Sequence, residues 1–391
     1  MVQALTGLCR KREKSHRGSR MRTDPVEPVT LCIINYNGLT YLQEAVANLK
    51  ALSTRFDEIL VVDNGSSDGS LSYLETIDKI TVLALPSNNG PASARNAGFL
   101  QASNDVILFQ DNDITLTDGV VVALYKTLQL NTKVLLTAPR VVYKSNPDII
   151  QFESADCHLL GMMSLRQANT RTDNAPMEIT QTSSMVSACF MIDRRRWRNQ
   201  SLPGKSPYNQ PINNQPLFDE DFIFNLEDHD LGVRANLLGF IILAVPHATV
   251  MHGSGTEGLS YRPGRAMSAT RMYCLIRNRW WIVCRYYSLR SLIILAPLML
   301  AFELLQLMGV ILKGWGKEWW RAFVDTVKHL PVLHAERKVY QALRQRADRE
   351  ILHTGSLPLT QAMNSGIVAR SCIGLFEMLM RGYGYLVKKL L

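Results

Sequence analysis

Two aspartates stand two positions apart directly after an apolar run, in the stretch ILFQDNDITL at 107–116. In an extended segment the side chains at positions i and i+2 share one face, so Asp111 and Asp113 would point the same way. Two carboxylates on one face at a strand end can hold a hard divalent cation, which usually also binds phosphate oxygens of a substrate. The alternative is a turn with an exposed acid pair, and the pair alone does not decide between the two.

A second group of acids, Glu227, Asp228 and Asp230, begins a segment whose apolar residues have helical spacing. The helix dipole stabilises acids in a first turn, so capping alone would explain them. The functional alternative is a general base, a carboxylate that stays ionised near neutral pH. His252 follows an apolar run at 241–245. A lone histidine is more often structural, and a metal ligand is the alternative.

Polar, turn-forming residues follow two further apolar runs. Asn35 and Asn37 belong to the first such cluster, NYNG, and Asp63, Asn64 and Gly65 begin the second, DNGSSDGS. A carboxylate in the second cluster could accept from a nucleobase N–H or from ribose hydroxyls. An ordinary Asx-turn followed by a helix cap explains the same residues, and taken alone it is the better explanation.

The stretch NNGP, which contains Asn89, opens a predicted helix that carries Arg95 one turn in. A helix N-terminus offers free N–H groups and a partial positive charge, and the arginine would add a full charge. These features are typical of an anion site, although a capped surface helix has the same sequence signals.

The elements that must position these residues alternate between strand and helix. Apolar runs and helical spacing predict strands at 29–34, 58–62, 80–85 and 106–110, with helices at 39–52, at 70–77 and from 91 onward. Such alternation implies crossover connections and a largely parallel sheet. Ligands of such sheets bind beyond the carboxyl ends of the strands. The polar clusters all fall at those ends, which is the strongest argument from the residues for a single site.

In this order and spacing, the segments resemble one family: the inverting nucleotide-sugar glycosyltransferases of family 2, in their bacterial rhamnosyltransferase-like branch. The segments are IINYNG, VVDNGSSDGS, NNGPASARNAG, QDND and LEDHDLGVRANLLGF followed by VPHATVMH. The resemblance covers roughly 28–264. It implies an α/β GT-A fold, Rossmann-like, with a mostly parallel sheet flanked by helices.

The resemblance also implies a role for each matching residue. Asp228 would be the catalytic base, and Asp113 would ligate Mg²⁺ or Mn²⁺ with His252 completing the metal shell. Asp111 would face the ribose and sugar of the donor and could also bind the metal. Glu227 and Asp230 are candidates for the acceptor side. The donor nucleotide would be bound by a larger set: Asn35, Asn37, Asp63, Asn64, Gly65, Asn89, Arg95, Asp111 and Asn112.

Charge is distributed unevenly along the 391 residues. The net charge is +6 over 1–22, −8 over 23–265 and +11 over 266–391. Because the basic C-terminal part also contains long apolar runs, we expect an anionic membrane surface as a partner and no nucleic acid. The segment 291–312 is long enough to span a bilayer, but Glu303 near its middle would cost about 3 kcal/mol. Helices lying in the membrane surface are therefore favoured over one span.

Three regions follow: a disordered basic arm at 1–27, a GT-A catalytic domain at 28–265 and a helical, membrane-associated region at 266–391. Seven scattered cysteines without a CxxC pair favour the cytoplasm. We therefore predict an enzyme at the cytoplasmic face of the inner membrane, peripheral or with a single span.

The predicted reaction moves a sugar from a UDP- or dTDP-sugar to a glycan or lipid-linked acceptor in cell-surface polysaccharide synthesis. The sequence contains no QxxRW motif, which favours addition of one or a few sugars. A nucleotidyltransferase and a non-catalytic, membrane-associated glycan-binding module are the alternatives, and an oligomer remains open.

Overall fold

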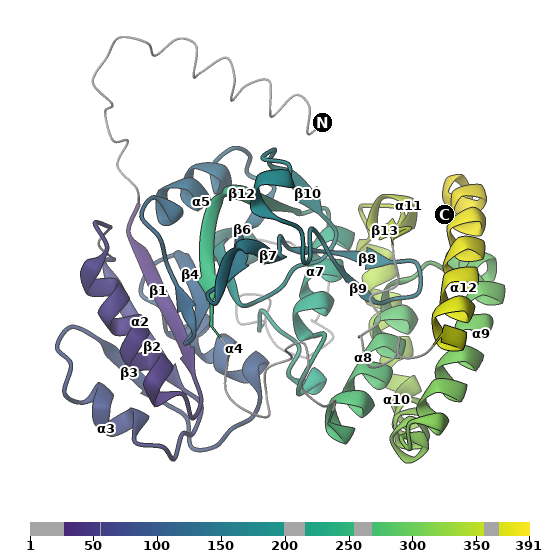
Figure 1. Cartoon of the computed structure of the whole chain (residues 1–391), viewed down its shortest axis with the longest axis horizontal. Helices are drawn as coiled ribbons and strands as arrows, with labels where there is room; N and C mark the ends of the chain where they lie inside the picture. Colours follow the sequence, from purple (N-terminus) through teal and green to yellow (C-terminus); the bar gives the residue numbers. More distant parts are fainter. Residues whose placement is uncertain (1–26, 55, 199–215, 254–267, 356–366) are drawn as a thin grey trace, which may run out of the picture.

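The computed structural model describes residues 27–54, 56–198, 216–253, 268–355 and 367–391, with backbone only for 367–373. The predicted basic arm, apart from its last residue, lies outside this part of the chain. A ten-stranded sheet forms the centre of the molecule, and long helices of the C-terminal part stand at one side of it (Figure 1). A small three-stranded sheet lies between these two parts.

The first four strands are parallel, in the order β3-β2-β1-β4. Their bounds agree with the predicted ones to within one residue. The strands are β1 (Val29–Asn35), β2 (Glu58–Asp63), β3 (Thr81–Ala84) and β4 (Val106–Asp111), and the connecting helices are α2 (Leu39–Ala51), α3 (Ser70–Leu74) and α4 (Pro91–Gln101). The carboxyl ends of β1, β2 and β4 therefore meet at one edge, as the alternating pattern predicted.

The other half of the sheet is mixed, so the expectation of a mostly parallel sheet is wrong there. β11 (Cys189–Asp193) runs antiparallel between β4 and β6, whereas β6 and β12 are parallel to each other. An apolar run does not encode strand direction, which is why the pattern missed this insertion. The remaining elements here are β5 (Ile114–Thr115), α5 (Val120–Leu128), β6 (Val134–Tyr143), β7 (Asn146–Phe152), β10 (Thr180–Thr182), α6 (Arg194–Arg198) and β12 (Ile241–His252).

Each face of the sheet packs against its own set of helices. In β1, Leu31 and Ile33 contact the core under α2, α3 and α5, while Cys32 and Ile34 contact the core under α4 and α7 (Glu227–Leu237). This alternation follows from the period of two in a strand. The core under α4 and α7 continues into the C-terminal helices, where it includes Phe302. The C-terminal part is thus packed onto the sheet rather than held by a linker.

The C-terminal part is helical, as expected, with one addition. A short strand, β13 (Leu352–His353), pairs in parallel with β8 (Ala155–His158), and β9 (Met163–Leu165) completes that sheet. The predicted boundary at residue 265 therefore separates strands of one sheet, since β8 and β9 lie before it and β13 lies after it. The helices are α8 (Ala269–Tyr286), α9 (Leu289–Leu312), α10 (Gly316–Leu343), α11 (Asp348–Ile351) and α12 (Ile367–Val387).

Candidate active site

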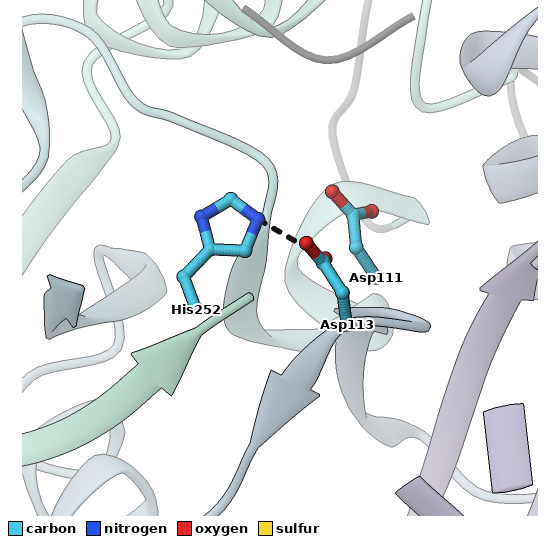
Figure 2. A group of neighbouring side chains, drawn as sticks. All are labelled: Asp111, Asp113 and His252. Atoms are coloured by element: carbon cyan, nitrogen blue, oxygen red, sulfur yellow. Dashed lines mark ion pairs between the residues drawn. The ribbon is translucent and has the colours of Figure 1, made fainter. Parts of the chain in front are cut away.

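Three potential metal ligands meet at the carboxyl edge of the sheet. Asp111 ends β4, Asp113 follows it by two residues, and His252 ends β12, which the antiparallel pairing with β5 brings alongside (Figure 2). One ligand atom from each lies within 4.8 Å of the others. Nε2 of His252 is 3.1 Å from Oδ1 of Asp113. These residues, predicted from widely separated segments, are brought together.

The orientation of His252 tests whether the group suits a cation. Its Nδ1 is 2.8 Å from Oε1 of Gln151, an amide oxygen that can only accept, so Nδ1 carries a proton. Nε2 then presents its lone pair toward the Asp113 carboxylate, as two ligands of one cation would. Adjacent ligand atoms on an octahedral Mg²⁺ lie about 3 Å apart. The three residues therefore fit a divalent metal.

Arg95 connects this group to the second group of acids. It projects from α4, is 3% exposed, and its guanidinium lies 2.6 Å from Oδ1 of Asp111 and 3.8 Å from Oε1 of Glu227. The sequence predicted an anion site at Arg95, and in the structure two carboxylates of the protein lie next to its guanidinium. Its charge therefore stabilises the acids on both sides of the site.

Glu227 and Asp228 begin α7, and both are almost fully buried. Asp228 accepts hydrogen bonds from the backbone N–H groups of Ser187 (3.3 Å) and His229 (2.8 Å). Burial raises the pKa of Asp228, and burial together with the neighbouring Asp228 charge raises the pKa of Glu227 to about 7. Because the Asp228 charge contributes to the raised pKa of Glu227, Asp228 is the acid of the pair that ionises first. A carboxylate of this kind can act as a general base.

The loop before this pair has a strained backbone. Ile223, Asn225 and Leu226 have φ values of 54°, 61° and 65°, a region that side chains with a Cβ rarely adopt. Its Ile223 carbonyl approaches Gly90 so closely that a Cβ there would lie 2.2 Å from the oxygen. The loop therefore touches the start of α4, on the donor side.

Asn278 of α8 holds this loop in place. Its fully buried amide nitrogen lies within hydrogen-bond distance of the carbonyl oxygens of Phe222 (3.0 Å), Phe224 (3.1 Å) and Asn225 (2.6 Å). No local sequence pattern marks this residue, because its partners lie more than 50 positions away. A residue of the C-terminal part thus fixes the segment that precedes Glu227 and Asp228.

Asp230, a candidate for the acceptor side, lies elsewhere. It is fully buried, it accepts a 2.6 Å hydrogen bond from the Tyr286 hydroxyl, and Arg285 is 3.6 Å from the same oxygen. Arg234 lies 3.3 Å from its other oxygen. These contacts join α7 to α8, so the geometry gives Asp230 a structural role instead of an acceptor contact.

The candidate donor residues organise the strand ends. Asp63 is fully buried and accepts from the Asn35 amide (2.8 Å) and the Ser66 N–H (2.8 Å). Asn35 in turn accepts from the Asn112 amide at 2.8 Å. This chain of bonds ties the ends of β1, β2 and β4 together. A contact from Asp63 to a nucleobase stays a prediction.

Four further donor candidates surround these strand ends. Asn64 donates to Oδ1 of Asn88 (2.9 Å) and to the Gly90 carbonyl (3.1 Å), so it links β2 to the start of α4. Asn37 accepts from the Ser67 N–H at 2.8 Å. Gly65 has φ +75°, and a Cβ there would lie 2.8 Å from the Ser87 backbone. Asn89 is exposed at the loop before α4. Asn89 is therefore the one of the four that points into solvent.

Comparison with known proteins identifies the class. Residues 30–208 match the model of glycosyl transferase family 2. An uncharacterized glycosyltransferase from Haemophilus influenzae is 33% identical over 82 residues, which cover 20% of this chain and 33% of that protein. A poly-β-1,6-N-acetyl-D-glucosamine synthase from Staphylococcus aureus is 30% identical over 101 residues, 25% of this chain and 24% of the synthase. The chain thus spans about a third or less of the length of these relatives.

The fold is also shared with a solved enzyme structure. GalNAc-T7, crystallised with UDP, GalNAc and Mn²⁺, superposes with a TM-score of 0.51 at 15% identity, over 68% of this chain and 49% of that one. The fold of this chain is therefore similar to that of a solved glycosyltransferase. Residues 30–208, somewhat under half of the chain, are similar to the glycosyltransferase family 2 domain.

Proposed function

We propose that this protein is a metal-dependent, inverting glycosyltransferase. It would move a sugar from a nucleotide-diphosphate sugar to a hydroxyl of a glycan or lipid-linked acceptor in cell-surface polysaccharide synthesis. One observation carries the proposal: the candidate metal-ligand group and Asp228 lie at one edge of the sheet, with Arg95 contacting Asp111 on one side and Glu227 on the other.

Asp228 would be the general base of the reaction. Its carboxylate, ionised while Glu227 holds the proton, would take the proton from an acceptor hydroxyl as the oxygen attacks the anomeric carbon from the face opposite the diphosphate. The sugar configuration is thereby inverted. A single base suffices, because no covalent sugar–enzyme intermediate has to be formed and broken, in contrast to a retaining hydrolase.

The donor side depends on Asp111, Asp113 and His252. These residues would hold Mg²⁺ or Mn²⁺, which supplies positive charge to the departing diphosphate. Gln151 keeps the ring of His252 turned toward Asp113, and Arg95 keeps Asp111 in place. The nucleotide would lie over the ends of β1 and β2, where UDP- and dTDP-sugars are the predicted donors.

The chemical nature of the acceptor determines where in the cell the enzyme would have to work. A lipid-linked acceptor requires an enzyme that works at a membrane surface, and we place this one at the cytoplasmic face of the inner membrane. Support comes from α9, which is long and apolar enough to cross a bilayer, and from the net charge of +11 over 266–391. The rhamnosyl branch remains the predicted sugar class.

Calorimetric titration with UDP, dTDP and GDP, each with and without Mn²⁺, tests the proposal. We expect one nucleotide to bind tightly, and this binding to disappear with a chelator and in Asp113→Ala. Asp118→Ala, which removes an exposed carboxylate bonded to Ser53, is the matched control. No diphosphate binding under any condition would overturn the transferase proposal and favour the non-catalytic module.

A nucleotidyltransferase is distinguished by its products. Incubation with the nucleotide sugar and acceptor releases a nucleoside diphosphate from a glycosyltransferase, whereas a nucleotidyltransferase acting on a sugar phosphate and a nucleoside triphosphate releases pyrophosphate. Release of pyrophosphate would therefore exclude the proposed reaction.

A further inference from the structure

The outward face of α9 is apolar along its whole length. Its exposed positions recur every three or four residues, and Leu300 and Leu304 are 65% and 69% exposed. This spacing puts them on one side of the helix. The opposite side, which includes Leu295 and Phe302, is buried against the protein. The exposed apolar residues of α9 are Leu289, Ile293, Pro297, Leu300, Leu304, Met308, Ile311 and Leu312.

A second helix extends this surface. α12 lies beside α9 (Figure 1), with the rings of Phe302 and Phe376 6.3 Å apart and a hydrogen bond from the Tyr383 hydroxyl to the Ile294 carbonyl. The exposed apolar residues of α12 and the turn after it are Leu375, Met378, Leu379, Tyr385, Leu386 and Leu390. We call these residues and those of α9 the apolar platform. A soluble monomer rarely exposes a continuous apolar surface of this kind.

The middle of α9 is bonded to α8, and through α8 to the catalytic domain. Glu303 accepts from Arg279 and, at 2.9 Å, from the Trp280 indole N–H. Arg279 also donates to the carbonyl of Leu160, a core residue next to β8, at 2.8 Å. In a spanning helix the middle would lie about 15 Å from either water layer. The catalytic domain cannot enter the bilayer, so these bonds argue against a spanning α9, and they pair Oε1 of Glu303.

Charge distinguishes a lipid surface from a second copy of the chain. Exposed basic residues border the apolar platform: Arg290 and Lys313 at the two ends of α9, and Arg381, Lys388 and Lys389 on or after α12. In a symmetric dimer the same patch meets itself, which would bring these like charges close together. Anionic headgroups would instead pair with these basic side chains.

We propose that α9 and α12 lie flat in one leaflet of an anionic bilayer, with the apolar platform inserted and its basic border on the headgroups. This specifies the membrane location in the proposed function, and it does not depend on the transfer reaction. The active site would then be held at a fixed height above the surface from which a lipid-linked acceptor is presented.

Vesicle flotation tests the insertion. The full-length protein should float with vesicles containing phosphatidylglycerol and much less with pure phosphatidylcholine. Leu300→Glu and Leu379→Glu should each weaken partitioning about tenfold or more, since each loses the burial of a large aliphatic side chain. Leu100→Glu, at a 50% exposed position on α4, is the matched control and should float normally. Nucleotide binding measured on the same samples reports separately on the site.

Spin-label depth measurements test the orientation. Nitroxides at Leu289→Cys, Leu300→Cys and Leu312→Cys, in a background with Cys9 and Cys372 replaced by serine, should report one shallow depth of about 5–10 Å. A profile that is deepest at position 300 and shallow at both ends would show a spanning helix and overturn the proposal. Failure to float, combined with a dimer that Leu300→Glu dissociates, would assign the apolar platform to a second copy.

Discussion

The donor half and the base half of the candidate site are formed in different ways. The donor half stands on the ends of adjacent strands, where the ladder between β1, β2 and β4 fixes the backbone and the Asn35–Asp63 and Asn35–Asn112 bonds fix the side chains. Its geometry is therefore largely settled once the parallel sheet has formed. Two of its candidate metal ligands, Asp111 and Asp113, come from the same strand end.

The base half stands on a strained loop that the C-terminal helices hold in place. Asn278 contacts three of its carbonyls, Arg277 donates to the Asp221 carbonyl at 2.7 Å, and Arg285 lies 2.5 Å from the Asp219 carboxylate. Arg285 is also 2.6 Å from Glu336 of α10. The position of Asp228 thus depends on helices that follow it by 50 to 110 residues. Changes in the C-terminal part should therefore affect the base more than the donor site.

The largest effect is expected from Asp228→Asn. Removing a general base slows the chemical step by about 10²–10⁴-fold, while the nucleotide contacts are unchanged. Transfer assays and calorimetry on the same preparation should thus give a large loss of kcat with a nearly normal nucleotide Kd. A parallel loss of nucleotide binding would contradict the separation of the two halves.

Asn278→Ala should affect kcat more than nucleotide binding. It leaves the carbonyls of Phe222, Phe224 and Asn225 without this donor, and an unsatisfied buried group costs about 1–3 kcal/mol. The strained loop would relax, and we expect a roughly tenfold to hundredfold lower kcat. Asn104→Ala removes a side-chain amide that bonds Thr30 at the amino end of the sheet, and it should leave kcat unchanged. An equal loss of nucleotide affinity and kcat in Asn278→Ala would instead indicate general unfolding.

The sequence predicted the strand ends that form the donor half well, because local patterns carry them. Each apolar run ends within one residue of the observed strand, and the polar residue after it lies at the sheet edge. Asn278 had no such signal, since nothing near it in the chain marks a donor to distant carbonyls. Gln151 was missed because it lies in a region without clear periodicity. Asp230 was misassigned because its neighbours in sequence face the site, whereas its own direction on the helix turns it toward α8.

Gln151→Ala is expected to weaken the metal site without abolishing it. The amide oxygen fixes the tautomer and ring orientation of His252, and loss of such a partner typically lowers metal affinity about 10- to 100-fold. Titration of Mn²⁺ in the presence of nucleotide measures this directly. Gln151→Glu keeps the acceptor and should retain metal binding, and Gln181→Ala, at a half-buried glutamine of β10, serves as the control. Unchanged Mn²⁺ affinity in Gln151→Ala would show that His252 is not a ligand.

Glu227→Gln should give the smallest change, visible in the pH dependence. In the wild type, activity falls at low pH as Asp228 takes up a proton, and burial places this loss above the ordinary carboxyl range near 4. As the pH rises through about 7, Glu227 loses its proton, and its new negative charge raises the proton affinity of Asp228 and makes it a stronger base. The profile of kcat/KM should therefore show a second, few-fold rise near pH 7 that the variant lacks. If Glu227→Gln kept that rise, the proton would have to reside on Asp228 and the assignment of the base within the pair would be reversed.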